Sequence, residues 1–343
     1  MVISVFAAMA MALAADSPNE LRLADRVSQV IVAPAPLRGS ITQGGVLVTG
    51  PELGDLGQLQ RSIGSWRRRA PEPIIVAADV ELGLLHRLHG HPGLPAVPDH
   101  IHAAEAGDIE TLGEQVGAVL KEVGIDLVFA PVLDLSSSGF MARTGRSVGD
   151  DPTRVAAVGK AYAAGLRRSG LLVVAKHYPG YGNAARSTDT HAVRAPPDTR
   201  ANHAAVFAAL APHVDGFLLS NLAYGEDVPA PASRTVVTSA HRMTPVVFTD
   251  DVAAARRAWR DRHLVANAFT AGVDVIVTSA PRDWTAHVDE PVWGEETWAL
   301  QDPAAELMTH LQAHPDAIPR LDESVCKIWD LAHRAGRRES PCI

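Results

Sequence analysis

The sequence has almost no cysteine, no excess of basic residues and no apolar run of membrane-spanning length beyond its N-terminus. Its 343 residues include two cysteines, Cys326 and Cys342. These cannot by themselves make a disulfide framework or a zinc site, although a single bond between them would suit an exported protein. The net charge of -8 gives no reason to expect nucleic acid as a partner, because phosphate binding needs a basic face. Past the N-terminal segment, no stretch approaches the roughly 18 consecutive apolar residues of a membrane span.

The remaining composition is that of a globular protein. Hydrophobic residues make up 47% of the chain and charged residues 20%. Both values are near the average, so neither a disordered nor a membrane-embedded chain is expected. A chain of this length holds one large domain or two ordinary ones. No repeat, low-complexity linker or shift in composition divides it, and we therefore expect a single domain over residues 16–343.

The N-terminal segment "MVISVFAAMAMALAAD" is apolar and ends in an Ala-x-Ala pattern over Ala12 to Ala14. This pattern resembles the hydrophobic region and cleavage site of a signal peptide, but the usual positive residues before it are missing. Residues 1–15 are predicted to be a signal peptide, and the alternative is an N-terminal helix that packs on the domain. The first interpretation predicts a secreted or cell-envelope protein, and the second a cytoplasmic one.

Short apolar runs recur along the chain with helix-length segments between them, which is the pattern of parallel β/α units. The runs are apolar throughout instead of alternating, as expected of strands that are covered on both faces. There are eight of them, so a closed (β/α)8 barrel of the TIM type is predicted. The runs are VIVAP from Val30, GVLVTG from Gly45, IIVAAD from Ile74, LVFAPVLD from Leu127, VVAKH from Val173, GFLLSN from Gly216, VVFTD from Val246 and DVIVTS from Asp274.

Several connecting segments carry helix signals. The segment after residue 150 begins with Asp151-Pro152, where an N-cap and a first helical residue belong, and ends in a glycine. The Ala-rich stretch over residues 199–214 and the stretch over residues 314–336 also read as helices. The gap between the first two strands is too short for an ordinary crossover helix, so that unit is predicted to be irregular.

The carboxyl ends of the strands in such a barrel carry the active site. Polar side chains follow the predicted strands at these ends, and a mouth rich in carboxylate, amide and cationic groups suits a polyhydroxylated ligand. Any one of them could instead cap a helix or join a surface ion pair. They are Asp79, Glu81, Asp134, Lys176, His177, Ser220, Asn221, Asp250 and Asp251.

Two carboxylates on separate strands, or one carboxylate and a His-Asp pair, are the minimum for glycoside hydrolysis. Asp250 is the better nucleophile candidate because it closes its strand, whereas Asp251 would point elsewhere as a helix cap. His191, with Asp189 two residues before it, is a candidate acid/base whose tautomer and charge the carboxylate would set. The alternative for His191 is a solvent-facing side chain on a loop.

Two further patterns predict no site. "GYGNAA" begins like a dinucleotide motif, but it lacks the final glycine and a following helix. A histidine cluster matches no zinc motif and lies in a proline-containing loop, so no metal is expected there. Its members are His86, His89, His91, His100 and His102.

With these residues in view, the chain resembles the catalytic domain of glycoside hydrolase family 3, in its single-domain β-N-acetylglucosaminidase branch. The resemblance runs from Leu21 to Ala335 and depends on the order of the segments more than on any single one. They are LRLADRVSQVIVA, IIVAADVELGLLHRL, GIDLVFAPVLDL, TGRSVGDDP, AKHYPGYG, PAS, VVFTDD and RLDESVCKIWDLA.

The resemblance implies a retaining mechanism in which Asp250 forms a covalent glycosyl-enzyme intermediate. In this branch the acid/base is a histidine of an Asp-Ser-His triplet on the loop after the Lys-His pair, and "DTH" offers Asp189 and His191 for that role. No cofactor or metal is implied. The positions that bind the sugar hydroxyls correspond to Asp79, Arg87, Arg146, Lys176 and His177.

The chain departs from the family pattern in three places. Tyr181 stands where the family has a histidine, Leu84 stands where it has an arginine, and the loop from Gly182 to Asp189 is two residues longer than usual. The leading hypothesis is a β-glycosidase that acts on N-acetylglucosamine-containing glycans such as cell-wall fragments. A catalytically weakened carbohydrate-binding homologue and a β-glucosidase or xylosidase of the same family are the alternatives. The sequence makes no prediction of oligomeric state.

Overall fold

A computed structural model describes residues 15–36, 39–83, 88, 106–280, 301–339 and 342. Arg87, the histidine cluster and the predicted signal peptide, apart from Ala15, lie outside the described residues.

Eight parallel strands form the centre of the molecule. Their order in the sheet is β7-β6-β5-β4-β3-β2-β1-β8, and a parallel bridge between Phe248 and Val275 joins its two edges. All eight predicted strands are present, and the (β/α)8 barrel is confirmed. They are β1 Ile31–Ala33, β2 Gly45–Val48, β3 Ile75–Ala78, β4 Leu127–Val128, β5 Leu172–Tyr178, β6 Gly216–Leu219, β7 Val247–Phe248 and β8 Ile276–Val277.

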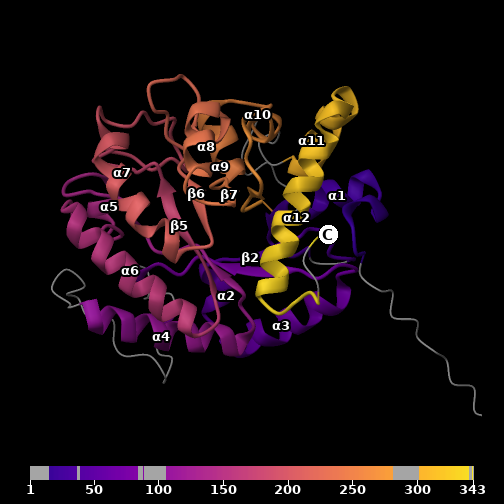
Figure 1. Cartoon of the computed structure of the whole chain (residues 1–343), viewed down its shortest axis with the longest axis horizontal. Coiled ribbons are helices and arrows are strands. Elements are labelled where there is room, and N and C mark those ends of the chain that lie inside the picture. The colour runs from indigo at the N-terminus through magenta and orange to yellow at the C-terminus, as the bar shows by residue number, and fades with distance from the viewer. Residues whose placement is uncertain are drawn as a thin grey trace, which may run out of the picture.

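The helices surround the strands on the outside of the barrel, with α4 and α6 side by side (Figure 1). The α-helices are α1 Leu23–Gln29, α2 Gly50–Leu53, α3 Leu56–Arg69, α4 Ala106–Val123, α5 Phe140–Arg143, α6 Pro152–Arg168, α7 Thr199–Leu210, α8 Arg234–His241, α9 Val252–Trp259, α10 Leu264–Ala271, α11 Pro303–Ala313 and α12 Ile318–Arg334. The 3-10 helices are η1 Pro18–Glu20, η3 Ala211–His213, η4 Ala230–Ala232 and η7 Pro315–Ala317. No helix within the described residues is long and apolar enough to cross a membrane.

The three predicted helices are confirmed as α6, α7 and α12. The carboxylate of Asp151 accepts a hydrogen bond from the backbone N–H of Thr153 at 2.9 Å, which satisfies one of the free donors at the start of α6. Gly170, just after α6, takes a φ of 79°, a conformation that glycine adopts without a steric cost. The described residues between β1 and β2 contain no helix, which confirms the irregular first unit.

Three buried aspartates precede β4, β6 and β8, at the amino ends of the strands. Asp126, Asp215 and Asp274 each accept a backbone N–H from the preceding strand in the order of the chain, at distances of 3.0, 2.7 and 2.9 Å. Each also pairs with two basic side chains from helices outside the barrel or the segment after α12. We call these three groups the strand-entry clamps. They fix the starts of β4, β6 and β8 to the outer layer of the barrel.

The C-terminal helix α12 ties the two ends of the described chain together. Trp329 on α12 donates from Nε1 to the side-chain oxygen of Gln29 at 3.0 Å, and Arg26 pairs with Asp322 at 2.9 Å. Cys326 on α12 forms a disulfide with Cys342. The helix α12 is therefore fixed both to α1 and to the segment that follows it.

Candidate active site

A cavity of about 370 Å³ opens at the carboxyl ends of the strands. It brings together six of the catalytic and sugar-binding candidates, whereas His191 is not among its lining residues; Asp251 also lines it. The six are Asp79, Arg146, Lys176, His177, Asp189 and Asp250. They come from β5 and from the loops that follow β3, β4, β5 and β7.

One edge of the cavity is a network of charges around a buried glutamate. Glu81 accepts two hydrogen bonds from Arg146, at 2.7 and 2.5 Å, and pairs with Nζ of Lys176 at 2.6 Å. Lys176 also pairs with Asp79, which is partly exposed. Burial raises the pKa of Glu81, but Lys176 and Arg146 reverse this effect and hold the pKa below its usual value. Glu81 therefore stays ionised and fixes both cations at the edge of the cavity.

Two partners fix the imidazole of His177, which is buried next to this network. Nδ1 lies 2.7 Å from a carboxylate oxygen of Asp134, and Nε2 lies 3.2 Å from a guanidinium nitrogen of Arg146. Because the guanidinium can only donate, Nε2 accepts and Nδ1 donates its proton to Asp134. Burial raises the pKa of Asp134, but His177 reverses this effect and keeps the pKa below its usual value.

Asp250 lies just after β7 and lines the cavity with part of its surface exposed. One carboxylate oxygen accepts the backbone N–H of Asp251 at 2.8 Å. Burial raises the pKa of Asp250 to about 6, and the Asp189 carboxylate contributes in the same direction, whereas His177 lowers it. Asp250 therefore combines a position at a strand end with a proton affinity tuned toward neutral pH.

Asp251 has a different role from its neighbour. Its carboxylate accepts the backbone N–H of Ala253 at 3.0 Å and so caps α9, as the sequence predicted. It also accepts hydrogen bonds from the backbone N–H and the hydroxyl of Ser279, at 2.9 and 2.5 Å. These contacts connect the end of β7 to the residues after β8.

Tyr181 anchors the loop that carries the candidate acid/base. Its buried hydroxyl donates to the hydroxyl of Thr188 at 3.0 Å and accepts the backbone N–H of Thr188 at 2.8 Å. The backbone N–H of Tyr181 donates to Asp134 at 2.7 Å, so one carboxylate orients both His177 and this anchor. Asp189, the residue after Thr188, lies on the cavity wall.

His191 is exposed on the same loop. Its Nδ1 lies 2.8 Å from the hydroxyl of Thr190. The structure therefore places the carboxylate of the candidate pair at the cavity and the imidazole outside it.

Sequence reasoning left three structural roles at this site unassigned. Two of these roles could have been suspected from the sequence, since Glu81 is the second acid of the Asp-x-Glu segment and Asp134 ends a predicted strand. No sequence pattern predicts the anchoring contact of Tyr181, because the family pattern has a histidine at this position. Among the described residues, no group of three or more His, Cys, Asp or Glu side chains could hold a metal ion.

The fold and the site together define a barrel enzyme whose mouth is rich in charged groups. The chain belongs to glycosyl hydrolase family 3, since residues 35–293 match the model of the family's N-terminal domain.

Curated relatives are beta-hexosaminidases. One from Xylella fastidiosa (strain M23) is 31% identical over 259 residues, which cover 69% of this chain and 76% of the relative. One from Methylococcus capsulatus is 30% identical over 268 residues, which cover 72% of this chain and 78% of the relative.

Solved structures share the fold. A glycoside hydrolase family 3 β-N-acetylglucosaminidase from Paenibacillus sp. aligns with a TM-score of 0.77 at 21% identity, covering 94% of this chain and 64% of that structure. A β-N-acetylhexosaminidase from Beutenbergia cavernae aligns with a TM-score of 0.71 at 25% identity. The alignment covers 92% of this chain and 98% of that structure. The chain thus spans less than two thirds of the first structure and nearly the whole of the second.

Proposed function

We propose that this protein is a retaining β-glycosidase that removes terminal β-linked N-acetylglucosamine, or a related hexose, from glycans such as cell-wall fragments. The observation that carries the proposal is the position of Asp250 in one cavity with Asp79, Lys176 and His177. A cavity of about 370 Å³ lies within the usual range for small-molecule sites. The names of the curated relatives support the choice of sugar.

In the proposed reaction, a carboxylate oxygen of Asp250 attacks the anomeric carbon as the bond to the aglycone oxygen breaks. The departing oxygen takes a proton from the acid/base, and a glycosyl ester of Asp250 remains. A water molecule then gives its proton to the acid/base and attacks the same carbon, which releases the sugar and the free carboxylate.

The proposed role of the charged edge is to hold the sugar hydroxyls. Carboxylate, ammonium and imidazole groups offer both acceptors and donors, which a polyhydroxylated ring needs. Because Glu81 and Asp134 already fix these groups, little further ordering is needed when the sugar binds. The binding groups are Asp79, Arg146, Lys176 and His177, with Arg87 assigned from the family pattern alone.

We propose Asp189 and His191 as the acid/base pair. Asp189 already lines the cavity, and His191 reaches a bound sugar when the loop turns inward at its exposed end. A His191→Ala variant tests this role with two substrates. The rate for a disaccharide with a poor leaving group falls strongly, because it needs protonation, whereas an activated aryl sugar is less affected. Unchanged rates with both substrates would remove His191 from the mechanism.

The nucleophile is tested with an aryl N-acetyl-β-glucosaminide. Asp250→Ala abolishes turnover, whereas Asp316→Ala, which changes an exposed aspartate on η7, leaves it intact. Equal rates for the wild type and Asp250→Ala would refute the proposed mechanism. An aryl β-glucoside and an aryl β-xyloside in the same assay distinguish a β-glucosidase or xylosidase from a hexosaminidase.

A second candidate function is a carbohydrate-binding homologue with weakened catalysis. The observation that favours it is the exposed position of His191 together with the anchoring of the loop by Tyr181. Calorimetry that detects sugar binding without turnover would support this candidate, and turnover at ordinary enzyme rates would exclude it.

We also propose that residues 16–343 form one domain that follows a signal peptide at residues 1–15, and that the mature protein is secreted or held in the cell envelope. The disulfide between Cys326 and Cys342 supports this location, since such bonds persist in oxidising compartments. Cell fractionation and the N-terminal sequence of the mature protein test it. An intact N-terminus in the cytoplasmic fraction would favour a cytoplasmic enzyme.

A further inference from the structure

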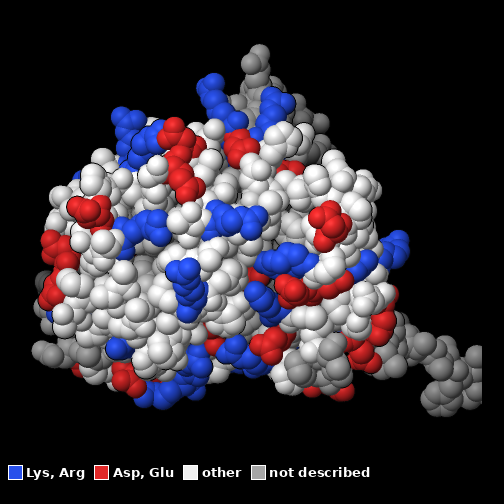
Figure 2. Space-filling model, turned by 45° about the horizontal axis from the view of Figure 1, so that its top comes forward, with Lys and Arg blue, Asp and Glu red and all other residues white. Residues whose placement is uncertain are grey.

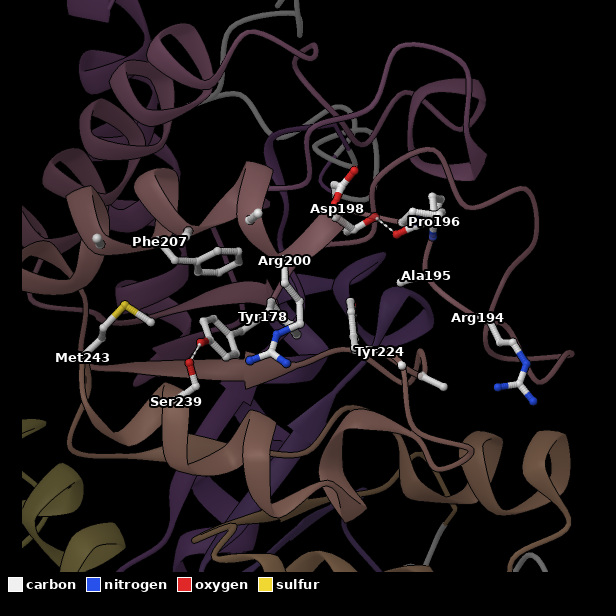
Figure 3. Close-up of a pocket in the computed structure, with 18 of the residues that line it drawn as sticks. Tyr178, Arg194, Ala195, Pro196, Asp198, Arg200, Phe207, Tyr224, Ser239 and Met243 are labelled. Atoms are coloured by element: carbon white, nitrogen blue, oxygen red, sulfur yellow. Dashed lines mark hydrogen bonds between the residues drawn. The ribbon is translucent and has the colours of Figure 1, made fainter.

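A second and larger cavity lies outside the barrel, between α7 and α8. Its volume is about 950 Å³, and within the described residues it shares no lining residue with the cavity that contains Asp250. The wall comes from the end of β5, from α7, from residues 194–198 and from the segments after β6 and around the end of α8 (Figure 3). It is therefore a separate site, with its own chemistry.

The wall of this cavity is mainly apolar and rests on packed aromatic rings. Tyr178 stacks on Phe217 with ring centroids 5.4 Å apart and meets Phe207 edge to face at 5.0 Å. The hydroxyl of Tyr178 lies 2.6 Å from that of Ser239 on α8. Phe207 and Met243 extend the apolar surface (Figure 3). Because the rings hold one another, the cavity is largely formed before a ligand arrives.

A cationic group lies in the middle of this apolar cavity. Arg200 projects between Tyr178 and Tyr224 in Figure 3, and its guanidinium forms no hydrogen bond or ion pair within the described part of the chain. Arg242, on the wall near Tyr178, is likewise without such a partner among the described residues. Burial raises the pKa of Tyr178, while both guanidinium groups act in the opposite direction, so both lie close enough to affect the Tyr178 hydroxyl.

The start of α7 adds to the positive character of the cavity. Asp198, at the N-cap position, has a φ of 62° and makes no side-chain hydrogen bond to the helix. In Figure 3 its carboxylate points away from Arg200. The positive end of the helix is thus left without a side-chain cap, and Thr199, Arg200 and Ala201 of its first turn line the cavity. Arg194, by contrast, already pairs with Asp227.

Charges of both signs occur across the face in Figure 2, and the whole chain carries a net charge of -8. An anion is therefore not attracted by the general field of the protein and has to be recognised by local groups. Unpaired guanidinium groups at an apolar cavity supply that recognition, since a guanidinium matches the two oxygens of a carboxylate.

We propose that this cavity binds an amphiphilic carboxylate, with the carboxylate at Arg200 and the apolar body against Tyr178, Phe207 and Met243. The volume of about 950 Å³ is near the upper end of the range for small-molecule sites and has room for an extended apolar body. The proposal does not depend on glycosidase activity.

Calorimetry with dodecanoate, below the concentration at which it forms micelles, tests the proposal on the full chain. Wild type binds dodecanoate, and it binds butyrate, which lacks the apolar body, and dodecyl maltoside, which lacks the charge, at least about tenfold more weakly. Equal binding of dodecyl maltoside would show that the guanidinium groups play no part and would overturn the proposal. Failure of dodecanoate to bind would overturn it as well.

Two variants locate the binding. Arg200→Gln weakens dodecanoate binding by about tenfold or more, because a charge-assisted hydrogen bond is lost. Ala204→Trp fills the cavity from the exposed side of α7 and has the same effect. The matched controls are Ala205→Trp, at an exposed α7 position that does not line the cavity, and Arg61→Gln, at an exposed position on α3. Circular dichroism confirms the fold of each variant.

Two further results would count against the proposal. If either cavity variant binds dodecanoate as the controls do, the ligand lies elsewhere. If sedimentation shows a dimer that Ala204→Trp dissociates and Ala205→Trp does not, a second copy of the chain covers the cavity in place of a carboxylate.

Discussion

The hydroxyl of Tyr181 holds the loop that carries the proposed acid/base through two hydrogen bonds to Thr188. Tyr181→Phe keeps the ring and its contacts with Phe140 and His177 but removes both bonds. We expect the free energy of unfolding to fall by about 1–2 kcal/mol, because the buried N–H of Thr188 loses its acceptor. For a substrate with a poor leaving group, we also expect kcat to fall more than KM changes. The loop carries the proposed acid/base, whereas the charged edge proposed to bind the sugar is unaltered.

Urea unfolding and steady-state kinetics check this prediction. Thr144→Val is a suitable control, because its exposed hydroxyl bonds to carbonyl oxygens of its own short helix. Unchanged stability and kinetics in Tyr181→Phe would show that the loop is held without the tyrosine hydroxyl.

The raised pKa of Asp250 has a cost in stability. Its value is about 6 in the folded chain against an ordinary 3.8, so between these values the folded chain holds the proton more tightly than the unfolded chain. The ionised carboxylate therefore destabilises the fold above about pH 6. We expect Asp250→Asn to raise the free energy of unfolding by about 3 kcal/mol at pH 7, with the gain disappearing as the pH falls toward about 4.

Urea unfolding of the wild type and Asp250→Asn at both pH values measures this effect. A gain of the same size at both, or no gain at pH 7, would show that the carboxylate is not disfavoured in the folded chain. The same pKa predicts that kcat/KM of the wild type falls as the pH drops below about 6, since the proposed nucleophile has to be ionised.

At the scale of single elements, the strand-entry clamps fix the starts of β4, β6 and β8. Asp215 accepts the N–H of Val173 and pairs with Arg167 and Arg334. Asp215→Ala leaves this N–H without its acceptor and the two cations without their buried partner. We expect the free energy of unfolding to fall by about 3 kcal/mol, while kcat and KM stay near wild type because the clamp lies at the opposite end of the barrel from Asp250.

Asp330→Ala is the matched control for the clamp, since Asp330 pairs with the same Arg334 at 3.9 Å but is half exposed. Its effect should stay within about 0.5 kcal/mol. Equal losses in the two variants, measured by urea unfolding, would mean that burial of Asp215 adds nothing to the pair.

The disulfide between Cys326 and Cys342 joins α12 to the chain end over a separation of 16 residues. A loop of this length is expected to contribute about 3 kcal/mol by restricting the unfolded chain. Cys342→Ser should therefore lower the free energy of unfolding by about that amount, and a reducing agent should do the same to the wild type. Urea unfolding measures both effects. If neither the substitution nor reduction of the wild type lowers the free energy of unfolding, the bond does not stabilise the fold.

The strands were predictable and the loop contacts were not, for a physical reason. A strand that is covered on both faces is apolar along its whole length, so a run such as that from Val173 indicates a strand by its composition alone. The contact between Tyr181 and Thr188 depends on how a seven-residue stretch of polar loop folds back. The second cavity depends on the spacing of α7 and α8, which no local pattern encodes.

In the candidate site, too, some residues could be placed from the sequence, whereas the contacts between them could not. Asp250, Lys176 and His177 follow apolar runs, so their place at the mouth comes from the order of the barrel. The role of Glu81 as the common partner of Lys176 and Arg146 joins residues 65 and more positions apart. Such contacts are consequences of the tertiary fold, and only the structure displays them.

At the scale of the whole molecule, the candidate active site and the stabilising ion pairs of the strand-entry clamps lie at opposite ends of the barrel. The carboxyl ends hold the charged groups around Asp250, and the amino ends hold the three strand-entry clamps. The family match covers residues 35–293, whereas Arg320, Lys327, Arg334 and Arg337 lie beyond it and supply basic partners to all three clamps.

This arrangement has a consequence for how the chain is made. As synthesis proceeds from the N-terminus, Asp126, Asp215 and Asp274 are all present before α12 has left the ribosome. Until then, each clamp lacks at least one of its cations, and a closed barrel would bury carboxylates that are incompletely neutralised. The nascent chain should therefore stay sensitive to proteases until α12 has left the ribosome and become resistant afterwards.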